Sequence, residues 1–534
     1  MTSRWIAPAA LVAVLLLALA VLVRLWGVAA EPLWLDEAYS AFAAAHDWRY
    51  LWQVVPQYET HPPFYYSLLR AWTLLWGDGL AGLRSLGLVA GIAALPVAAL
   101  AANEIGLLTR RRPAERALLV LVSLAFVGVS PVLIEMSREV RPYPLMILVY
   151  STAIVAMLRT VRRVEETGRL PIRPLATYAV ALALMLWLHN LGLLFGATLA
   201  LAFGFLLVGR LPLRDWRWLV AAHLVAALLW TPALLILIDQ APTWIHKTWL
   251  TFRLETLPRH LISLYASYRP PVTTRDATIL ALAILAAMGL LGLAIGLRRW
   301  RLAVALALLA GLPVATAVVL SMTISPVFIV RIMTPVAVPA MLLAAIGATL
   351  PGYWRWPGLL FAGLLMFGLA KADLGVRRGP PMENWYGVAR FIAERMGPGD
   401  QVWTYPNESA LPFDFAVRDL AIAQRARPIP APVPAIGWPG GWYPTGSRGV
   451  VSVPREQLRG FAVEGRSVPT IWLIRAGART YDPGDMLVEE LSRTRRPIAR
   501  WRSGPIDVIG LRRTDLLPQV SGRRAAPAAA TAAR

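Results

Sequence analysis

The sequence predicts an all-α polytopic membrane domain of about eleven transmembrane helices, followed by a small α/β domain outside the membrane. The chain is 57% hydrophobic and 16% charged, whereas a soluble protein carries about 25% charged residues. Its apolar residues fall into separate blocks close to the ~20 residues that a membrane span needs. After Lys371 the composition becomes polar, and this change predicts the second domain.

Eleven blocks are long and apolar enough to be candidate spans. The first has no charge from Ile6 to Val23, which is longer than the apolar core of a signal peptide and predicts an uncleaved anchor. Cleavage after Ala30 is the alternative. The candidate spans are residues 5–27, 80–103, 117–134, 144–161, 174–189, 191–209, 216–238, 277–297, 301–321, 332–350 and 357–371.

The distribution of arginine decides the orientation. The net charge is +22, and arginines gather in the short loops after every second span, such as Arg110–Arg112 and Arg298–Arg301. Because such loops stay in the cytoplasm, we expect a multi-pass protein of the inner (plasma) membrane with a cytoplasmic N-terminus. The segment 63–76 then lies in the interface, within the first outward loop 28–79, and is not a twelfth span.

The same distribution limits the classes of partner. Arginines in short loops between apolar blocks determine the orientation of the spans and interact with anionic lipid headgroups. These roles account for the positive charge, so nucleic acid is excluded as a partner. The chain contains no cysteine, which excludes disulfides and thiolate chemistry.

Residues 1–375 are expected to form the membrane domain and residues 380–517 the extracytoplasmic domain. In the latter, Glu383 to Arg395 has the pattern of an amphipathic helix. Gln401 to Tyr405 and Thr470 to Ile474 have the pattern of strands. A Pro/Gly/Trp-rich loop is expected from Pro428 to Pro444 and a disordered tail over 521–534.

Two adjacent carboxylates, Asp36 and Glu37, follow the first span. Carboxylates at a membrane interface are costly unless water, a cation or a partner stabilises them. Transfer of a sugar to a hydroxyl or amine needs a base that takes the acceptor's proton, and one of the two can do this while the other holds a cation. The alternative is a solvated pair at the start of an interfacial helix, where acidic residues are favourable.

A second outward motif contains Glu59 and His61 ahead of two prolines. Their nitrogen and oxygen ligands could hold a divalent cation, and His189 is placed on the same side of the membrane. The alternative is a structural turn in which His61 caps the following helix.

Three arginines in outward segments are candidates for binding phosphate. Arg138 and Arg141 lie in the second outward loop, and Arg331 opens the tenth span. Arginine offers paired donors to phosphate, as a lipid-phosphate leaving group requires. The alternatives are local ion pairs with Glu139 and, for Arg331, a side chain that reaches from the span to the interface.

The order of these motifs resembles the GT-C superfamily of polyprenyl-phosphate-sugar transferases, in particular the protein O-mannosyltransferase and aminoarabinose-transferase group. The likeness covers most of residues 5–420. The motifs that carry it are Leu35 to Ala38, His61 to Tyr66, Ser137 to Tyr143, Arg331 with Pro335 and Pro339, Asn384-Trp385, and Pro398-Gly399-Asp400.

The resemblance implies inverting transfer of a sugar from a polyprenyl-phosphate carrier, with Asp36 as general base and Glu37 beside it. It implies that Arg138 and Arg141 bind the carrier phosphate. Metal use varies in the superfamily, so a divalent cation at Glu59, His61 and His189 stays open. The remaining residues expected to contact substrate are Tyr39, His61, Tyr65, Glu139 and Tyr143. Some relatives carry an aspartate in the second outward loop; here Glu139 or Glu135 would have to serve.

Two other functions fit a polytopic protein. A transporter or lipid-linked-sugar flippase would place ionisable groups within broken spans near the midplane, whereas these spans are nearly free of charge. A non-catalytic assembly protein would not need the acidic pair and the arginines together. The resemblance leaves the acceptor open among a lipid, a glycan and a protein.

Overall fold

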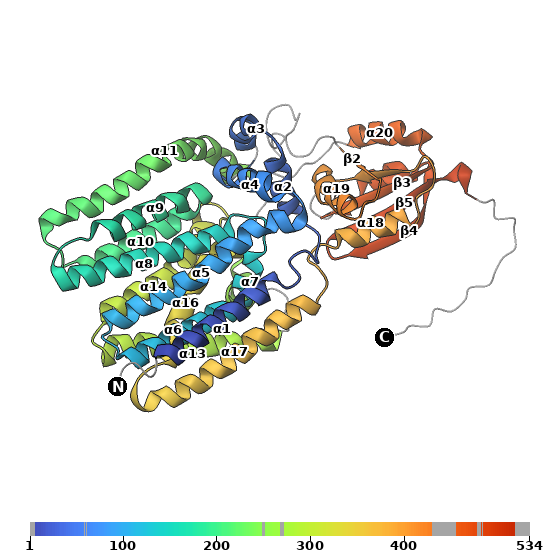
Figure 1. Ribbon diagram of the computed structural model, residues 1–534. Coiled ribbons are helices and arrows are strands. Elements are labelled where there is room, and N and C mark those ends of the chain that lie inside the picture. Colours follow the sequence, from blue (N-terminus) through green and yellow to red (C-terminus); the bar gives the residue numbers. More distant parts are fainter. Residues whose placement is uncertain are drawn as a thin grey trace. The chain divides into compact units, whose positions relative to one another are not determined.

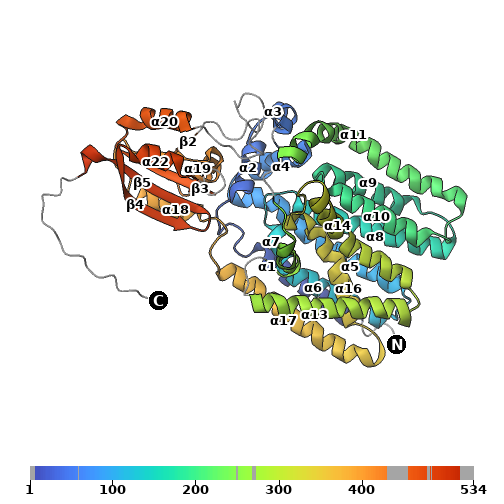
Figure 2. The ribbon, with the colours of Figure 1, turned by 180° about the vertical axis from the view of Figure 1, so that it is seen from behind.

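The computed structural model describes residues 6–57, 59, 61–247, 251–267, 272–429, 455–477, 482 and 484–517. It contains two compact units, and the described chain passes from the first to the second between Met382 and Glu383. The first unit is helical and the second contains a β-sheet (Figures 1 and 2). The predicted tail 521–534 and the predicted loop beyond Ile429 lie outside the described residues.

The first unit is a bundle of long helices, with the short helices α2, α3 and α4 at one end of it (Figure 1). Its helices are α1 Ile6–Leu25, α2 Leu35–Ala45, α3 Trp48–Gln53, α4 Pro63–Trp76, α5 Leu80–Leu108, α6 Pro113–Val129, α7 Pro131–Ser137, α8 Tyr143–Thr167, α9 Ile172–Leu188, α10 Gly192–Leu207, α11 Trp216–Lys247, α12 Leu257–Ala266, α13 Val272–Leu291, α14 Trp300–Thr323, α15 Val330–Met333, α16 Ala337–Ala348 and α17 Arg355–Arg378.

Within the described residues, eight helices are long and apolar enough to cross a membrane, or nine if the bent pair α6 and α7 forms one span. Helices α9 and α10 are apolar but have 17 and 16 residues, which is short for a span. Together these helices correspond in order to the eleven predicted blocks. The segment predicted to lie in the interface is α4, which has 14 residues.

The predicted span 117–134 is wrong as a continuous helix. Helix α6 ends at Val129, α7 begins at Pro131, and the two are bent by 61°. Proline has no amide hydrogen and cannot continue the ladder of α6. The carbonyls at the end of α6 therefore need other donors, and the buried Arg24 guanidinium donates to Val127 and Gly128 at 3.1 and 3.0 Å.

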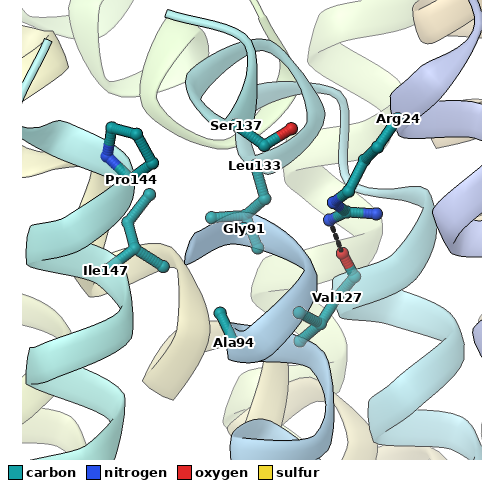
Figure 3. A pocket seen from close by; sticks show the side chains of 8 residues that line it. All are labelled: Arg24, Gly91, Ala94, Val127, Leu133, Ser137, Pro144 and Ile147. Atoms are coloured by element: carbon teal, nitrogen blue, oxygen red, sulfur yellow. Dashed lines mark hydrogen bonds between the residues drawn. The ribbon is translucent and has the colours of Figure 1, made fainter. Parts of the chain in front are cut away.

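Two glycines let α7 and the loop after it approach α5. A Cβ on Gly91 would lie 2.3 Å from the Cβ of Ser137, and a Cβ on Gly87 would lie 2.9 Å from the carbonyl oxygen of Glu139. Figure 3 shows Gly91 and Ser137 on the wall of a small cavity where α1, α5, α6, α7 and α8 meet. This close contact fixes the position, relative to α5, of the loop that carries Arg138 and Arg141.

The second unit has a five-stranded sheet in the order β2-β1-β3-β5-β4. Strands β2, β1 and β3 are parallel, and β5 and β4 are antiparallel to their neighbours. The predicted helix and both predicted strands are confirmed as α18, β1 and β3. The elements are α18 Trp385–Ala393, β1 Gln401–Thr404, α19 Ala410–Asp419, β2 Ala426–Pro428, α20 Arg455–Glu464, β3 Thr470–Ala476, α22 Met486–Ser492, β4 Arg495–Ser503 and β5 Ile506–Arg513.

Helices α18 and α19 cover one face of this sheet. Trp385, Ile392 and Phe413 from the two helices form a buried cluster with Trp472 and Val508 from the strands. Strands β1 and β3 are almost wholly buried. Their sequences therefore lack the strict alternation of apolar and polar residues that is typical of a sheet with one exposed face. This unit therefore has its own core.

Candidate active site

Asp36 stands in the first turn of α2, where the helix dipole favours a negative charge. Its Oδ2 accepts a hydrogen bond from Arg331 Nη2 at 3.2 Å and lies 4.0 Å from Arg141 Nη2. The side chain is 32% exposed, so a substrate group can reach it. Two predicted phosphate ligands and the predicted base thus meet at one carboxylate.

Glu37, the neighbouring carboxylate, has a different environment. It is 2% exposed and forms an ion pair of 2.8 Å with Arg84 of α5. Its Oε1 also accepts the backbone N–H of Val140 at 3.0 Å. A carboxylate so completely engaged is not available to a substrate, and the structure places Glu37 as a link between α2, α5 and the loop of Arg141.

Arg141 lies at the centre of the site and is buried. It donates to the Asp36 carbonyl at 3.4 Å and to Ser40 Oγ at 3.3 Å, and its Nη2 lies 3.3 Å from His61 Nε2. The same Nη2 lies 3.5 Å from His61 Nδ1, and this nitrogen is 2.5 Å from Glu59 Oε1. The chain of contacts therefore runs from Glu59 through His61 and Arg141 to Asp36.

Burial and neighbouring charges determine the protonation of Glu59 and His61. Burial alone would raise the pKa of Glu59, but His61 and Arg141 outweigh it and lower this pKa to about 2. Burial, together with the guanidinium of Arg141, lowers the pKa of His61. Glu59 is therefore ionised at neutral pH and orients the imidazole.

Arg331 comes from the short helix α15. Its guanidinium carbon lies 4.4 Å from the centre of the Trp34 ring, a cation–π contact that holds the side chain beside Asp36. The side chain is partly exposed. Arg331 thus has a fixed position and a face open to a ligand.

Arg138 does not join the other two arginines. Its Nε donates to the Arg24 carbonyl at 3.0 Å, and its Nη2 donates to the carbonyls of Val23 and Trp26 at 2.5 and 2.7 Å. Val23 and Arg24 belong to the last turn of α1, whose carbonyls lack helical donors, and Trp26 directly follows the helix. The structure therefore brings Arg141 and Arg331 together and directs Arg138 to the end of α1.

Glu139 is close to the same cations. Burial raises its pKa to about 8, although Arg331 and Arg141 oppose the increase. Its Oε2 is enclosed and has no hydrogen-bond partner among the described residues. Glu139 therefore carries a proton at neutral pH.

The predicted tyrosines surround Arg141. Tyr65 and Tyr143 are buried and within electrostatic range of its guanidinium. Tyr39 packs edge-on against Tyr66, with ring centres 6.1 Å apart. Tyr65 also packs edge-on against Tyr66 at 5.5 Å, so Tyr39, Tyr66 and Tyr65 form one aromatic cluster near Arg141.

The predicted metal ligands do not assemble into a metal site. The rings of His61 and His189 are in edge contact at 4.6 Å, and His189 Nδ1 accepts the Leu191 N–H at 3.0 Å. Within the ranges that the structure describes, no three His, Asp or Glu side chains are placed to hold a metal ion. The Arg141 cation beside His61 Nε2 also opposes a second cation there, so we derive no step through a metal.

Sequence reasoning missed Arg84, Trp34 and Ser40. Arg84 carried a signal, because a charged residue near the start of a span requires a partner, and Glu37 is that partner. Trp34 and Ser40 carried none, since their roles depend on Arg331 and Arg141, which are distant in sequence.

No family model and no curated protein matches the chain. Solved structures with the same fold exist. A crystal structure of ArnT from Cupriavidus metallidurans in the apo state matches with a TM-score of 0.57 and 14% identity, covering 93% of this chain and 97% of that one. A crystal structure of the same enzyme bound to undecaprenyl phosphate matches with a TM-score of 0.53 and 14% identity, covering 98% and 100%. The chain therefore has the fold of the aminoarabinose transferase ArnT, which confirms the GT-C resemblance at the level of the fold.

Proposed function

We propose that the protein is an integral membrane glycosyltransferase, which transfers a sugar from a polyprenyl-phosphate carrier to an extracytoplasmic acceptor. The observation that carries the proposal is the meeting of Asp36 with Arg141 and Arg331 at one end of an apolar bundle. A base and two phosphate-binding cations at a membrane interface suit this reaction and few others. That a structure of the same fold holds undecaprenyl phosphate supports a carrier of this class.

The reaction follows from these roles. Asp36 takes the proton of an acceptor hydroxyl or amine, and the freed electron pair attacks the anomeric carbon of the donor sugar. The bond from that carbon to the phosphate oxygen breaks on the opposite face, which inverts the anomeric configuration. Arg141 and Arg331 stabilise the departing polyprenyl phosphate by charge-assisted hydrogen bonds.

Other residues support these groups. Glu37 and Arg84 hold the first turn of α2, and His61, paired with Glu59, lies against the guanidinium of Arg141. We assign Arg138 to the end of α1 and not to the phosphate. The acceptor is a lipid, a glycan or a protein on the extracytoplasmic side.

The test is Asp36→Asn in the native cell, with analysis of lipid-linked sugars and envelope glycans. A general base contributes about 10²- to 10⁴-fold to a rate, so we expect the donor to accumulate and one glycosylated product to fall by that range. Asp47→Asn is the matched control, because Asp47 is an exposed cap of α3 and asparagine caps equally well. A normal product level in Asp36→Asn would reject Asp36 as the base. Accumulation of the donor on the cytoplasmic face alone would instead favour a flippase.

A further inference from the structure

The segment from the last turn of α1 to the start of α2, residues 23–34, leads directly to Asp36. We call it the connector. Its backbone makes turn hydrogen bonds from Val28 to Leu25 and from Ala30 to Gly27, which do not fix an irregular segment in space. Side chains from three distant elements hold it instead.

Arg84 of α5 holds the second half of the connector. Its Nη1 donates to the carbonyls of Val28 and Glu31 at 2.8 and 2.9 Å, and its Nη2 donates to Pro32 at 3.2 Å. The same guanidinium pairs with Glu37 at 2.8 Å. One buried cation thus links the connector to the residue next to Asp36.

Arg138 and Arg377 hold the first half. Both donate to the carbonyls of Val23 and Trp26, Arg377 at 2.8 Å to each. Arg377 belongs to α17, and Asp373 one turn earlier fixes it through an ion pair of 2.6 Å. Its guanidinium also stacks on the Trp26 ring at 5.1 Å.

We infer that Arg84, Arg138 and Arg377 are positioning residues that set the location of Asp36 by holding the connector through its carbonyls. The inference rests on the proposed function, since it assigns Asp36 as the base. Ordinary capping of α1 would need one cation near its last turn, whereas here two guanidiniums share the same carbonyls and a third continues along the irregular chain. Displacement of a catalytic group by about 1 Å can cost about 100-fold in rate.

The role of α17 follows from the same contacts. Arg377 lies near the end of the last membrane helix, six residues before the second unit begins at Glu383. The position of that helix end is therefore transmitted to the connector, and through it to Asp36.

Arg377→Met tests the inference in the purified full-length protein in nanodiscs. Methionine keeps an apolar stem but removes the donors. We expect faster hydrogen exchange over residues 26–37 and a roughly 10- to 100-fold lower turnover. The KM for the donor identified in the cell experiment and the binding of undecaprenyl phosphate should stay unchanged. Arg377→Lys, which keeps a donor, should recover part of the rate, and Arg378→Met, at an exposed neighbour, is the control.

A double variant separates positioning from general weakening. If Arg377 acts through Asp36, Arg377→Met should cost little further rate in an Asp36→Asn background. Equal exchange and turnover in Arg377→Met and Arg378→Met would overturn the inference. If Arg377→Met does not fold, Arg377→Lys carries the same comparison. A wild-type protein without transfer activity, but with faster exchange in Arg377→Met, would reject the proposed function and leave the connector contacts standing.

Discussion

At the scale of single residues, Asp36 and Glu37 are adjacent but have opposite surroundings. Asp36 lies beside the guanidiniums of Arg331 and Arg141 and is still accessible to solvent. Glu37 is buried and is bound by Arg84 and by the backbone N–H of Val140. The difference arises because consecutive residues of a helix point about 100° apart. Asp36 is therefore open to a substrate, whereas Glu37 links the surrounding elements.

The two arginines at Asp36 should bind the carrier phosphate, and Arg138 should not. A charge-assisted hydrogen bond contributes about 1.5–3 kcal/mol, so we expect Arg141→Ala or Arg331→Ala to weaken undecaprenyl phosphate binding by about 10- to 150-fold. Arg138→Ala should change this affinity little. Titration of each purified variant with undecaprenyl phosphate measures the difference, and equal losses in all three would contradict the assignment.

Glu139 should make phosphate binding sensitive to alkaline pH. Its pKa of about 8 means that the carboxyl is neutral at pH 7 and gains a negative charge as the pH rises through 8. That charge lies near Arg331 and Arg141 and would repel a phosphate. The phosphate has a second pKa of about 6, so its own charge hardly changes above pH 7.5. Affinity for undecaprenyl phosphate should therefore fall between pH 7.5 and 9.

Glu139→Gln imitates the neutral carboxyl and should remove this pH dependence while keeping the affinity found at pH 7. Glu166→Gln, which changes an exposed ion pair with Arg163, is the control and should retain the wild-type profile. An unchanged alkaline decline in Glu139→Gln would assign the titration to another group.

At the scale of elements, the approach of α7 to α5 sets the loop of Arg141. Gly87→Ala would place a Cβ 2.9 Å from the Glu139 carbonyl and 3.0 Å from that of Ser137. Backbone atoms cannot move aside as a flexible side chain does, so the loop must shift. We expect lower turnover and a lower melting temperature.

Gly311→Ala is the matched control for Gly87→Ala. It lies within α14, and a Cβ there would meet nothing within 4 Å. Alanine is favoured over glycine in a helix by about 1 kcal/mol, so Gly311→Ala should be neutral or slightly stabilising. Melting curves and turnover of both variants in one detergent give the comparison.

Hydropathy and motif order predicted much at this scale. The apolar blocks correspond to the long helices, and Asp36, Arg141 and Arg331 meet although 295 positions separate the first from the last. The break at Pro131 was readable from the proline but was not predicted, because hydropathy continues through it. The direction of Arg138 could not be predicted, since its partners are backbone carbonyls that leave no pattern in the sequence.

At the scale of the whole molecule, the orientation in the membrane is a prediction from the arginine loops. The chain has no cysteine, so single cysteines give labelling without background. Arg502→Cys in the second unit and Ala114→Cys at the start of α6 are both at exposed positions. In intact cells, an impermeant maleimide should label the first and not the second until the membrane is opened. The reverse result would invert the topology and place the site in the cytoplasm.

The site also depends on helices from the beginning and the end of the first unit. Asp36 comes shortly after α1, the first long helix. Arg331 lies in the short helix α15 just before α16, and Arg377 lies in α17, the last helix of the first unit. No single stretch of sequence contains the site, which explains why motif spacing predicted its members better than its geometry. Supporting residues such as Arg84 and Asp373 become visible as such only when the helices are packed.

The ion pair between Asp36 and Arg331 has a consequence for the order in which substrates bind. Arg331 Nη2 cannot donate fully to a carboxylate and to a carrier phosphate at once. A donor that claims this group loosens Asp36 at the moment when the sugar arrives, and an unpaired carboxylate is the stronger base. Binding of the donor would thus raise the basicity of Asp36 before the acceptor arrives. Steady-state kinetics should then follow a compulsory sequence, with the lipid-linked sugar entering first and the acceptor second.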